Sequence, residues 1–185
     1  MNASNPVSGT ARVAAVLITT LWLSGAAADP AADYDIGAEA YRGDDVVTAM
    51  QYLGRAASAG HADAQYLLGY ILDKAGENET AMGHYRTAFE NGNADAAFEL
   101  GTMYVSGDGV EKSLEMARSW YEKAAAAGNN RALEVLARAY LDGGLGLTQD
   151  EARARELLGS ASENGSDSAR VLLESLDKGA SETPD

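Results

Sequence analysis

The sequence contains no cysteine, and it has only two histidines, His61 and His84. The absence of cysteine excludes disulfide cross-links and thiol chemistry, so the chain must be stabilised by the packing of its helices. Neither histidine has a second histidine or a glutamate at metal-ligand spacing on the same face of a predicted helix. We therefore predict no metal site and no cofactor.

Basic residues are also scarce, because 14 Lys and Arg stand against 28 Asp and Glu, which gives a formal net charge of −14. No run of Lys and Arg is present that could neutralise the phosphates of a nucleic acid or of an anionic bilayer. We therefore expect no nucleic-acid partner. Two interpretations of the acidity stay open: it could favour a basic partner surface, or it could only keep the protein soluble.

A long hydrophobic run is missing as well. The most apolar segment, residues 13–23, has eleven residues, whereas a membrane-spanning helix needs about 20. Arg12 precedes this segment, and small residues that include Ala26 and Ala28 follow it, which is the pattern of a secretory signal peptide. We predict a signal peptide over residues 1–28, a periplasmic or secreted protein, and no stable membrane insertion after cleavage. A retained membrane anchor is the alternative.

The dominant feature that the sequence does contain is a repeat. The phrase GHADAQYLLG at residues 60–69 returns as GNADAAFELG at residues 92–101, and more faintly from residue 128. The glycines that close the units are 32, 36 and 37 residues apart, which is the length of a helix-turn-helix repeat; they are Gly60, Gly92, Gly128 and Gly165. Each is expected to end a helix in the left-handed region of backbone space. Since one helix pair cannot bury its own apolar face, the units must stack.

The positions within each unit follow the spacing of a helix face. The second helix of the third unit carries Ala117, the pair Trp120 and Tyr121, and the pair Ala124 and Ala125, and the other units keep this register. We predict a repeat domain over residues 29–179, with units at about 32–60, 61–92, 93–128 and 129–165. A capping helix at 166–178 and a disordered tail at 180–185 complete the predicted organisation.

Three motifs resemble the Sel-one-like repeat, a relative of the tetratricopeptide repeat. They are ADAQYLLG at residues 62–69, Tyr104-x-x-Gly-x-Gly-Val110, and Ala117-x-x-Trp-Tyr-x-Lys-Ala-Ala-x-x-Gly128. The resemblance implies an all-α fold, an α-solenoid that coils as a right-handed superhelix of about four antiparallel helix-turn-helix repeats. It also implies an adaptor for protein complexes, because exported relatives include periplasmic regulators of sensor kinases and scaffolds for polysaccharide secretion. A disulfide-stapled exported subgroup is associated with β-lactam binding or hydrolysis, but this chain lacks the paired cysteines.

Candidates for other chemistry have structural explanations. We expect His61 to be solvated after a helix end and His84 to pack between helices, because it takes the position of Trp120, itself a predicted core residue. Asp44 and Asp108 do not form a calcium loop; Asp44 is predicted to cap the next helix, and Asp108 to lie in a turn. We therefore predict no catalytic residues and no enzyme.

Binding must then depend on first-helix residues that packing leaves free. In related superhelices these helices line the concave face, and the free positions are predicted at Asp63, Leu67, Tyr70, Ile71, Asp95, Glu99, Thr102, Met103, Arg131, Val135 and Arg138. We predict that Tyr70, Glu99, Met103 and Arg138 hold a peptide or a helix of an envelope protein. Two alternatives remain: a cell-wall-active module that binds peptidoglycan or a β-lactam, and a spacer that assembles end to end.

Overall fold

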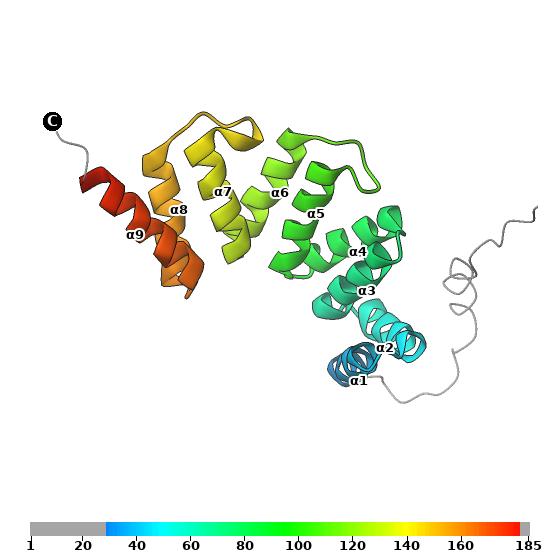
Figure 1. Ribbon diagram of the computed structural model, residues 1–185. Coiled ribbons are helices and arrows are strands. Elements are labelled where there is room, and N and C mark those ends of the chain that lie inside the picture. Colours follow the sequence, from blue (N-terminus) through cyan, green and yellow to red (C-terminus); the bar gives the residue numbers. More distant parts are fainter. Residues whose placement is uncertain (1–28, 182–185) are drawn as a thin grey trace, which may run out of the picture.

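The computed structural model describes residues 29–181, which form an array of helices in chain order (Figure 1). The predicted signal peptide and residues 182–185 lie outside the described residues. The helices are α1 (Pro30–Arg42), α2 (Val46–Ser58), α3 (Ala62–Lys74), α4 (Asn78–Glu90), α5 (Ala94–Ser106), α6 (Leu114–Ala126), α7 (Asn130–Asp142), α8 (Glu151–Glu163) and α9 (Asp167–Ser181), with a short 3-10 helix, η1 (Gly144–Gly146), before α8.

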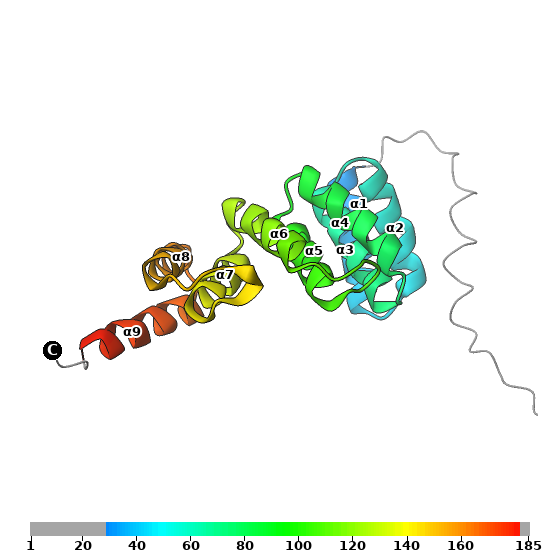
Figure 2. The same cartoon turned by 90° about the horizontal axis from the view of Figure 1, so that it is seen from above.

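Each odd-numbered helix from α1 to α7 pairs with the even-numbered helix that follows it, and α9 packs on α8. The pairs are stacked so that each second helix also contacts the first helix of the next unit. Figure 2, seen from above, shows that successive pairs are rotated relative to one another along the array. The prediction of an all-α solenoid is confirmed. None of the described helices combines the length and the hydropathy that a membrane-spanning segment requires.

The helices begin and end where their sequences supply the right groups. Most begin after a residue whose side chain accepts a hydrogen bond from a backbone N–H of the first turn, as Asn93 does from Ala96 at 2.9 Å. This hydrogen bond satisfies a backbone donor that has no partner within the helix. The four closing glycines all have positive φ, between +86° and +100°, which confirms their predicted role. The prediction for Asp44 was wrong by one residue: Asp45 caps α2 by accepting from the N–H of Thr48, and Asp44 has a φ of 60°.

Within a unit, the two helices approach closely because a small residue faces a large one. A Cβ on Gly69 would lie 2.8 Å from the ring of Tyr85, and one on Gly101 would lie 2.7 Å from the ring of Tyr121. In the fourth unit the matching position is Ala137, which packs in the same cluster as Leu158 rather than against an aromatic ring. The helix spacing in each unit is therefore set by a matched pair of side chains.

The core follows the array in three consecutive clusters. One joins α2 and α3, the largest extends from α3 to α7, and the third joins α7, α8 and α9. Each unit is thus stabilised by its neighbours. At the end of the array α9 continues to Ser181, so residues 180 and 181, which the sequence places in a disordered tail, are helical.

Candidate protein-interaction surface

Side-chain hydrogen bonds connect the first helices of successive units directly. Asn93 Nδ2 at the start of α5 donates to Asp63 Oδ1 on α3 at 2.7 Å, and Asn129 Nδ2 at the start of α7 donates to Asp95 Oδ1 on α5 at 2.6 Å. Ser166 donates to Glu134 on α7 at 2.6 Å. These contacts bring one side of α3, α5 and α7 together. We call this side the first-helix face; it comprises Asp63, Tyr66, Tyr70, Asp95, Phe98, Glu99, Thr102, Arg131, Glu134 and Arg138.

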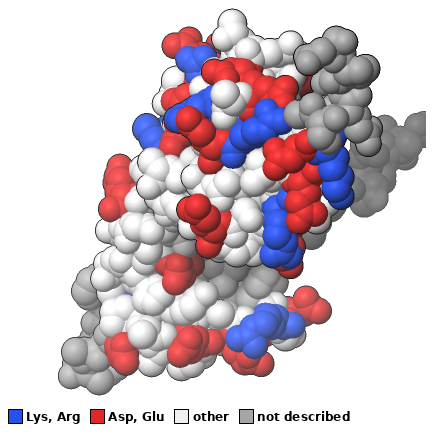
Figure 3. Space-filling view, turned by 90° about the vertical axis from the view of Figure 1, so that its left-hand side faces the viewer, with Lys and Arg blue, Asp and Glu red and all other residues white. Residues whose placement is uncertain are grey.

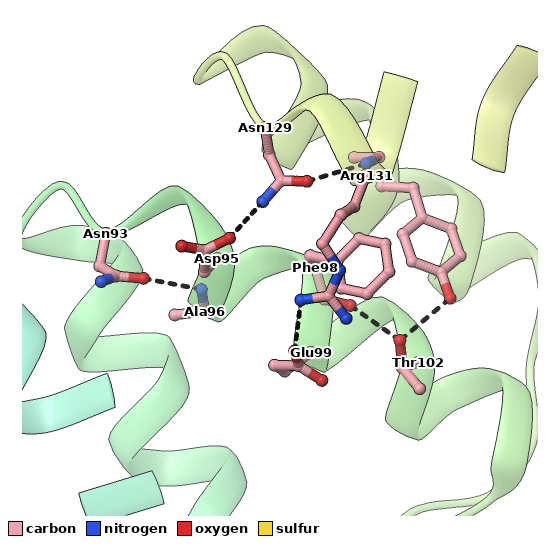
Figure 4. A network of polar contacts seen from close by, with 10 residues as sticks. Asn93, Asp95, Ala96, Phe98, Glu99, Thr102, Asn129 and Arg131 are labelled. Carbon is pink, nitrogen blue, oxygen red and sulfur yellow. Dashed lines mark hydrogen bonds and ion pairs between the residues drawn. The ribbon is translucent and has the colours of Figure 1, made fainter. Parts of the chain in front are cut away.

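In the units that begin with α5 and α7, one asparagine performs two tasks at this face (Figure 4). The Oδ1 of Asn129 accepts from the N–H of Ala132 at 2.8 Å and so caps α7, while its Nδ2 donates to Asp95. Asn129 is only 7% exposed. Because the same side chain starts the helix and binds the preceding unit, it fixes the position of one unit against the next.

The centre of the face carries an ion pair between α5 and α7. Arg131 Nη1 lies 3.0 Å from Glu99 Oε1, and the Arg131 guanidinium lies 3.9 Å from the centroid of the Phe98 ring. The Thr102 hydroxyl lies 3.2 Å from the hydroxyl of Tyr121 (Figure 4). The Arg131 side chain is 57% exposed and that of Glu99 is 21% exposed, so Arg131 offers the larger surface to a partner.

Two tyrosines on the first helices, Tyr66 and Tyr34, have a raised pKa. Burial, followed by the charges of Glu99 and Asp95, raises the pKa of Tyr66 to about 12, while Arg131 lowers it. Burial and the charges of Asp63 and Asp35 similarly raise the pKa of Tyr34 on α1. The face therefore combines phenolic hydroxyl groups with carboxylates, and it can both donate and accept hydrogen bonds.

Three of the four predicted contact residues lie on the first-helix face. The Tyr70 ring is partly exposed, lies edge-on to Tyr41 at 6.3 Å, and has Lys74 Nζ at 5.1 Å. Glu99 is held by Arg131 as described above. The Arg138 side chain is 62% exposed and lies 3.8 Å from Glu134. Tyr70 and Glu99 both raise the pKa of Tyr66, so they lie near the same ring. Arg138 pairs with Glu134 instead.

The prediction for Met103 was wrong. Met103 is 4% exposed and belongs to the central core cluster, and Ile71, at the matching position of α3, is also buried. This position faces the second helix of the preceding unit and is therefore used for packing. Sequence analysis instead missed Tyr66 and the two asparagines, although the recurrence of Gly-Asn at residues 92–93 and 128–129 was a signal for the latter.

The histidines have structural roles. His61 is not simply solvated: its Nδ1 accepts from the N–H of Ala64 at 3.3 Å and caps α3, and its ring stacks on Tyr34 at 4.7 Å. His84 is half-buried, and burial lowers its pKa. Among residues 29–181, no group of three His, Cys, Asp or Glu side chains could hold a metal ion.

These features define an α-solenoid of tetratricopeptide-like helix pairs, a class of protein that works by presenting a repeated surface. The model of the Sel1 repeat matches residues 30–61, 62–93, 94–129 and 131–166, and the chain therefore belongs to the Sel1 repeat family. Sel1 repeats indicate a helical scaffold for protein-protein interaction.

Solved structures of similar proteins are consistent with membership of this family. A Sel1 repeat protein from Oxalobacter formigenes is 31% identical, with a TM-score of 0.66 over 78% of this chain and 63% of that one. A protective antigen present in uropathogenic Escherichia coli strains, displaying an SLR fold, is 29% identical, with a TM-score of 0.65 over 76% of this chain and 32% of that one. The chain therefore spans less than two thirds of these two relatives.

A more distant structure, the cysteine-rich protein B of Helicobacter pylori, is 22% identical, with a TM-score of 0.58 over 70% of this chain and 95% of that one. At this identity the likeness concerns the fold alone. No similar protein was found among the curated proteins.

Proposed function

We propose that this protein is an exported, non-enzymatic adaptor that works in the periplasm and serves a membrane signalling or exopolysaccharide system. The observation that carries the proposal is the first-helix face, which extends over α3, α5 and α7 and presents Tyr70, Arg131 and Arg138 at its surface. Tyr and Arg are residues on which binding energy often concentrates. The leader pattern of residues 1–28 supports export.

The partner is expected to be small in cross-section. Each first helix from α1 to α7 has 13 residues, which corresponds to about 20 Å at 1.5 Å per residue. A surface of this width accommodates an extended peptide or a single helix of an envelope protein. The phenols and carboxylates around Tyr66 would bind its polar groups, and Arg138 would bind an acidic side chain or a carbonyl.

The experiment is site-specific photo-crosslinking in the cell envelope. A crosslinker at position 70 or 138 should capture one envelope protein, whereas the same group at Glu122, an exposed position on the second helix α6, should not. Tyr70→Ala and Arg138→Ala should each weaken binding of the captured protein by about fivefold or more, with helicity unchanged, and Glu122→Ala should have no effect.

Two outcomes would contradict the proposal. Equal capture from the first-helix face and from Glu122 would show that this face is not the binding surface. Capture of only glycan fragments, together with binding to purified peptidoglycan or turnover of a β-lactam, would favour the cell-wall-active alternative instead.

A further inference from the structure

Two aromatic rings hold the same position on successive first helices. Tyr66 on α3 and Phe98 on α5 are the seventh residues of the matching phrases GHADAQYLLG and GNADAAFELG. The Tyr66 ring packs at a tilt on Tyr85 of its own second helix, with centroids 5.8 Å apart. The Phe98 ring packs in the same way on Tyr121, with centroids 5.3 Å apart. Because the two rings match within their units, the groups that the next unit places over them can be compared directly.

The next unit places a cation over Phe98. The guanidinium of Arg131 lies 3.9 Å from the centroid of the ring, and its Nη1 lies 3.0 Å from Glu99 Oε1 (Figure 4). Beneath this side chain Phe98 is only 8% exposed. A guanidinium stacked on a ring and paired with a carboxylate is a favourable arrangement, because the cation meets the negative face of the ring while its N–H groups donate to an anion.

Over Tyr66 the matching cation is missing. Arg131 stands three residues after the closing glycine of the unit before it, and the residue three positions after Gly92 is Asp95. The Tyr66 side chain stays partly exposed. Burial has the largest effect on the pKa of Tyr66, and Glu99 and then Asp95 each raise this pKa by more than Arg131 lowers it. A ring and carboxylates therefore meet here as they do at Phe98, but in a negative field.

The neighbouring rings already have such a partner. The His61 ring stacks on Tyr34, with centroids 4.7 Å apart and planes at 17°. The Nζ of Lys74 lies 5.1 Å from the centroid of Tyr70. Within residues 29–181, no Lys or Arg lies over the Tyr66 ring. Tyr66 is thus the ring of the first-helix face that can still accept a cation.

The negative charge beside Tyr66 is not balanced within the array. Asp63 accepts a hydrogen bond from the amide of Asn93. Asp95 accepts one from the amide of Asn129. Both donors are neutral, so neither carboxylate gains an opposite charge from them. The arginines of α8 and α9, in contrast, each pair with a carboxylate, and Figure 3, which views the α9 side, shows basic and acidic side chains interleaved over much of that end.

We propose that the Tyr66 ring, Asp95 and Glu99 form a subsite that binds an arginine side chain of the partner. The inference rests on the proposed function, because it names a group that the first-helix face takes from its peptide or helix. The guanidinium stacks on Tyr66 as Arg131 stacks on Phe98, and it donates to the two carboxylates. Arginine fits better than lysine, because its planar end group can stack on a ring and still donate several hydrogen bonds from its edge.

The test is an NMR titration of the isotope-labelled protein, purified in the form that the cells produce, with N-acetyl-arginine amide. The matched control is N-acetyl-citrulline amide, which has nearly the same shape and a planar end group but no charge. We expect the arginine compound to shift the backbone amide signals around Tyr66, Asp95 and Glu99 in a saturable way. It should bind there about fivefold more tightly than the citrulline compound, because both the stacking on the ring and the pairing with carboxylates depend on the charge.

Variants separate the ring from the carboxylate. Asp95→Asn keeps an acceptor for Asn129 and should weaken arginine binding about fivefold. Tyr66→Leu should weaken it by a similar factor, whereas Tyr66→Phe keeps the ring and should bind as the wild type does. Asp95→Arg should abolish binding, because its own guanidinium would cover the ring. Glu122→Gln, at an exposed carboxylate on α6, should change nothing. Circular dichroism checks that each variant is folded.

Equal binding of the arginine and citrulline compounds would overturn the proposal, and so would arginine shifts spread evenly over the acidic surface. Undiminished binding at Tyr66 by Asp95→Arg would also overturn it. The titration needs no partner protein, so the two proposals can fail separately. Arginine binding at Tyr66 without capture of an envelope protein from positions 70 and 138 would contradict the adaptor function alone. Capture without arginine binding would contradict the subsite alone.

Discussion

The close approach of the two helices in the third unit gives a quantitative prediction for Gly101→Ala. An added Cβ would lie 2.7 Å from Cδ1 and Cε1 of Tyr121, whose ring is 5% exposed and whose hydroxyl is held by Thr102. Alanine is favoured over glycine in a helix by about 1 kcal/mol, but overpacking a core costs about 1–3 kcal/mol. We therefore expect Gly101→Ala to lower the free energy of unfolding by about 0–2 kcal/mol, the sum of these two opposed effects.

Gly83→Ala is the matched control. Gly83 lies within α4, and nothing stands within 4 Å of its added Cβ, so only the helix preference acts and stability should rise by about 0.5–1 kcal/mol. The double variant Gly101→Ala with Tyr121→Leu reproduces the Ala137 and Leu158 pairing of the fourth unit. It should be less destabilised than the sum of the single variants, by about 1–3 kcal/mol, because the overlap is relieved.

Urea unfolding followed by circular dichroism measures these differences as shifts of the midpoint, provided that the slope stays constant across the variants. A rise in stability of Gly101→Ala equal to that of Gly83→Ala would refute the reasoning. It would mean that the ring of Tyr121 moves aside without cost, and that helix spacing is not set by this pair.

Further predictions concern caps, titration and turns. Asn129→Ala should destabilise the array by about 1–2 kcal/mol in urea unfolding, whereas Asn129→Ser, which keeps a cap, should lose less. Burial lowers the pKa of His84 from 6.5, so the folded array binds fewer protons than the unfolded chain as the pH falls below about 6.5. Stability should therefore decrease at low pH, and it should decrease less in His84→Phe. Urea midpoints measured at pH 7.5 and pH 5 would show this difference. Gly128→Ala should cost about 1 kcal/mol for its positive φ alone, and Gly109→Ala more, because its Cβ would also lie 2.7 Å from a neighbouring Cβ; equal urea midpoints would contradict this. Difference absorbance titration of wild type against Tyr66→Phe should show the Tyr66 phenol ionising near pH 12.

The sequence predicted the architecture because its determinants are local. Glycine at a fixed period marks helix ends, and the positive φ of Gly60 and Gly92 depends on the absence of a Cβ at those residues alone. The alternation of small and large residues on each helix likewise gives the register of the pairs. Neither inference needs knowledge of distant contacts.

The surface was harder to predict because α3, α5 and α7 are each covered on two sides, by the second helix of the preceding unit and by that of their own unit. Only a narrow sector stays free, and Met103, one residue after the exposed Thr102, already lies in the core. The bond from Asn129 to Asp95 joins residues 34 positions apart, so it depends on how one unit is rotated against the next. That rotation results from packing and cannot be calculated from the periodicity of one helix.

The dual asparagines have a consequence for how such a protein changes length. Asn93 and Asn129 each join a unit to the one before it through the same pair of groups. A duplication or deletion of the unit formed by α5 and α6 would therefore lengthen or shorten the array while the neighbouring units still met through an Asn–Asp pair. Insertion or deletion of only part of a unit would misplace the residues that cap its helices. Evolution and protein engineering can accordingly treat the unit as the smallest transferable segment of this chain.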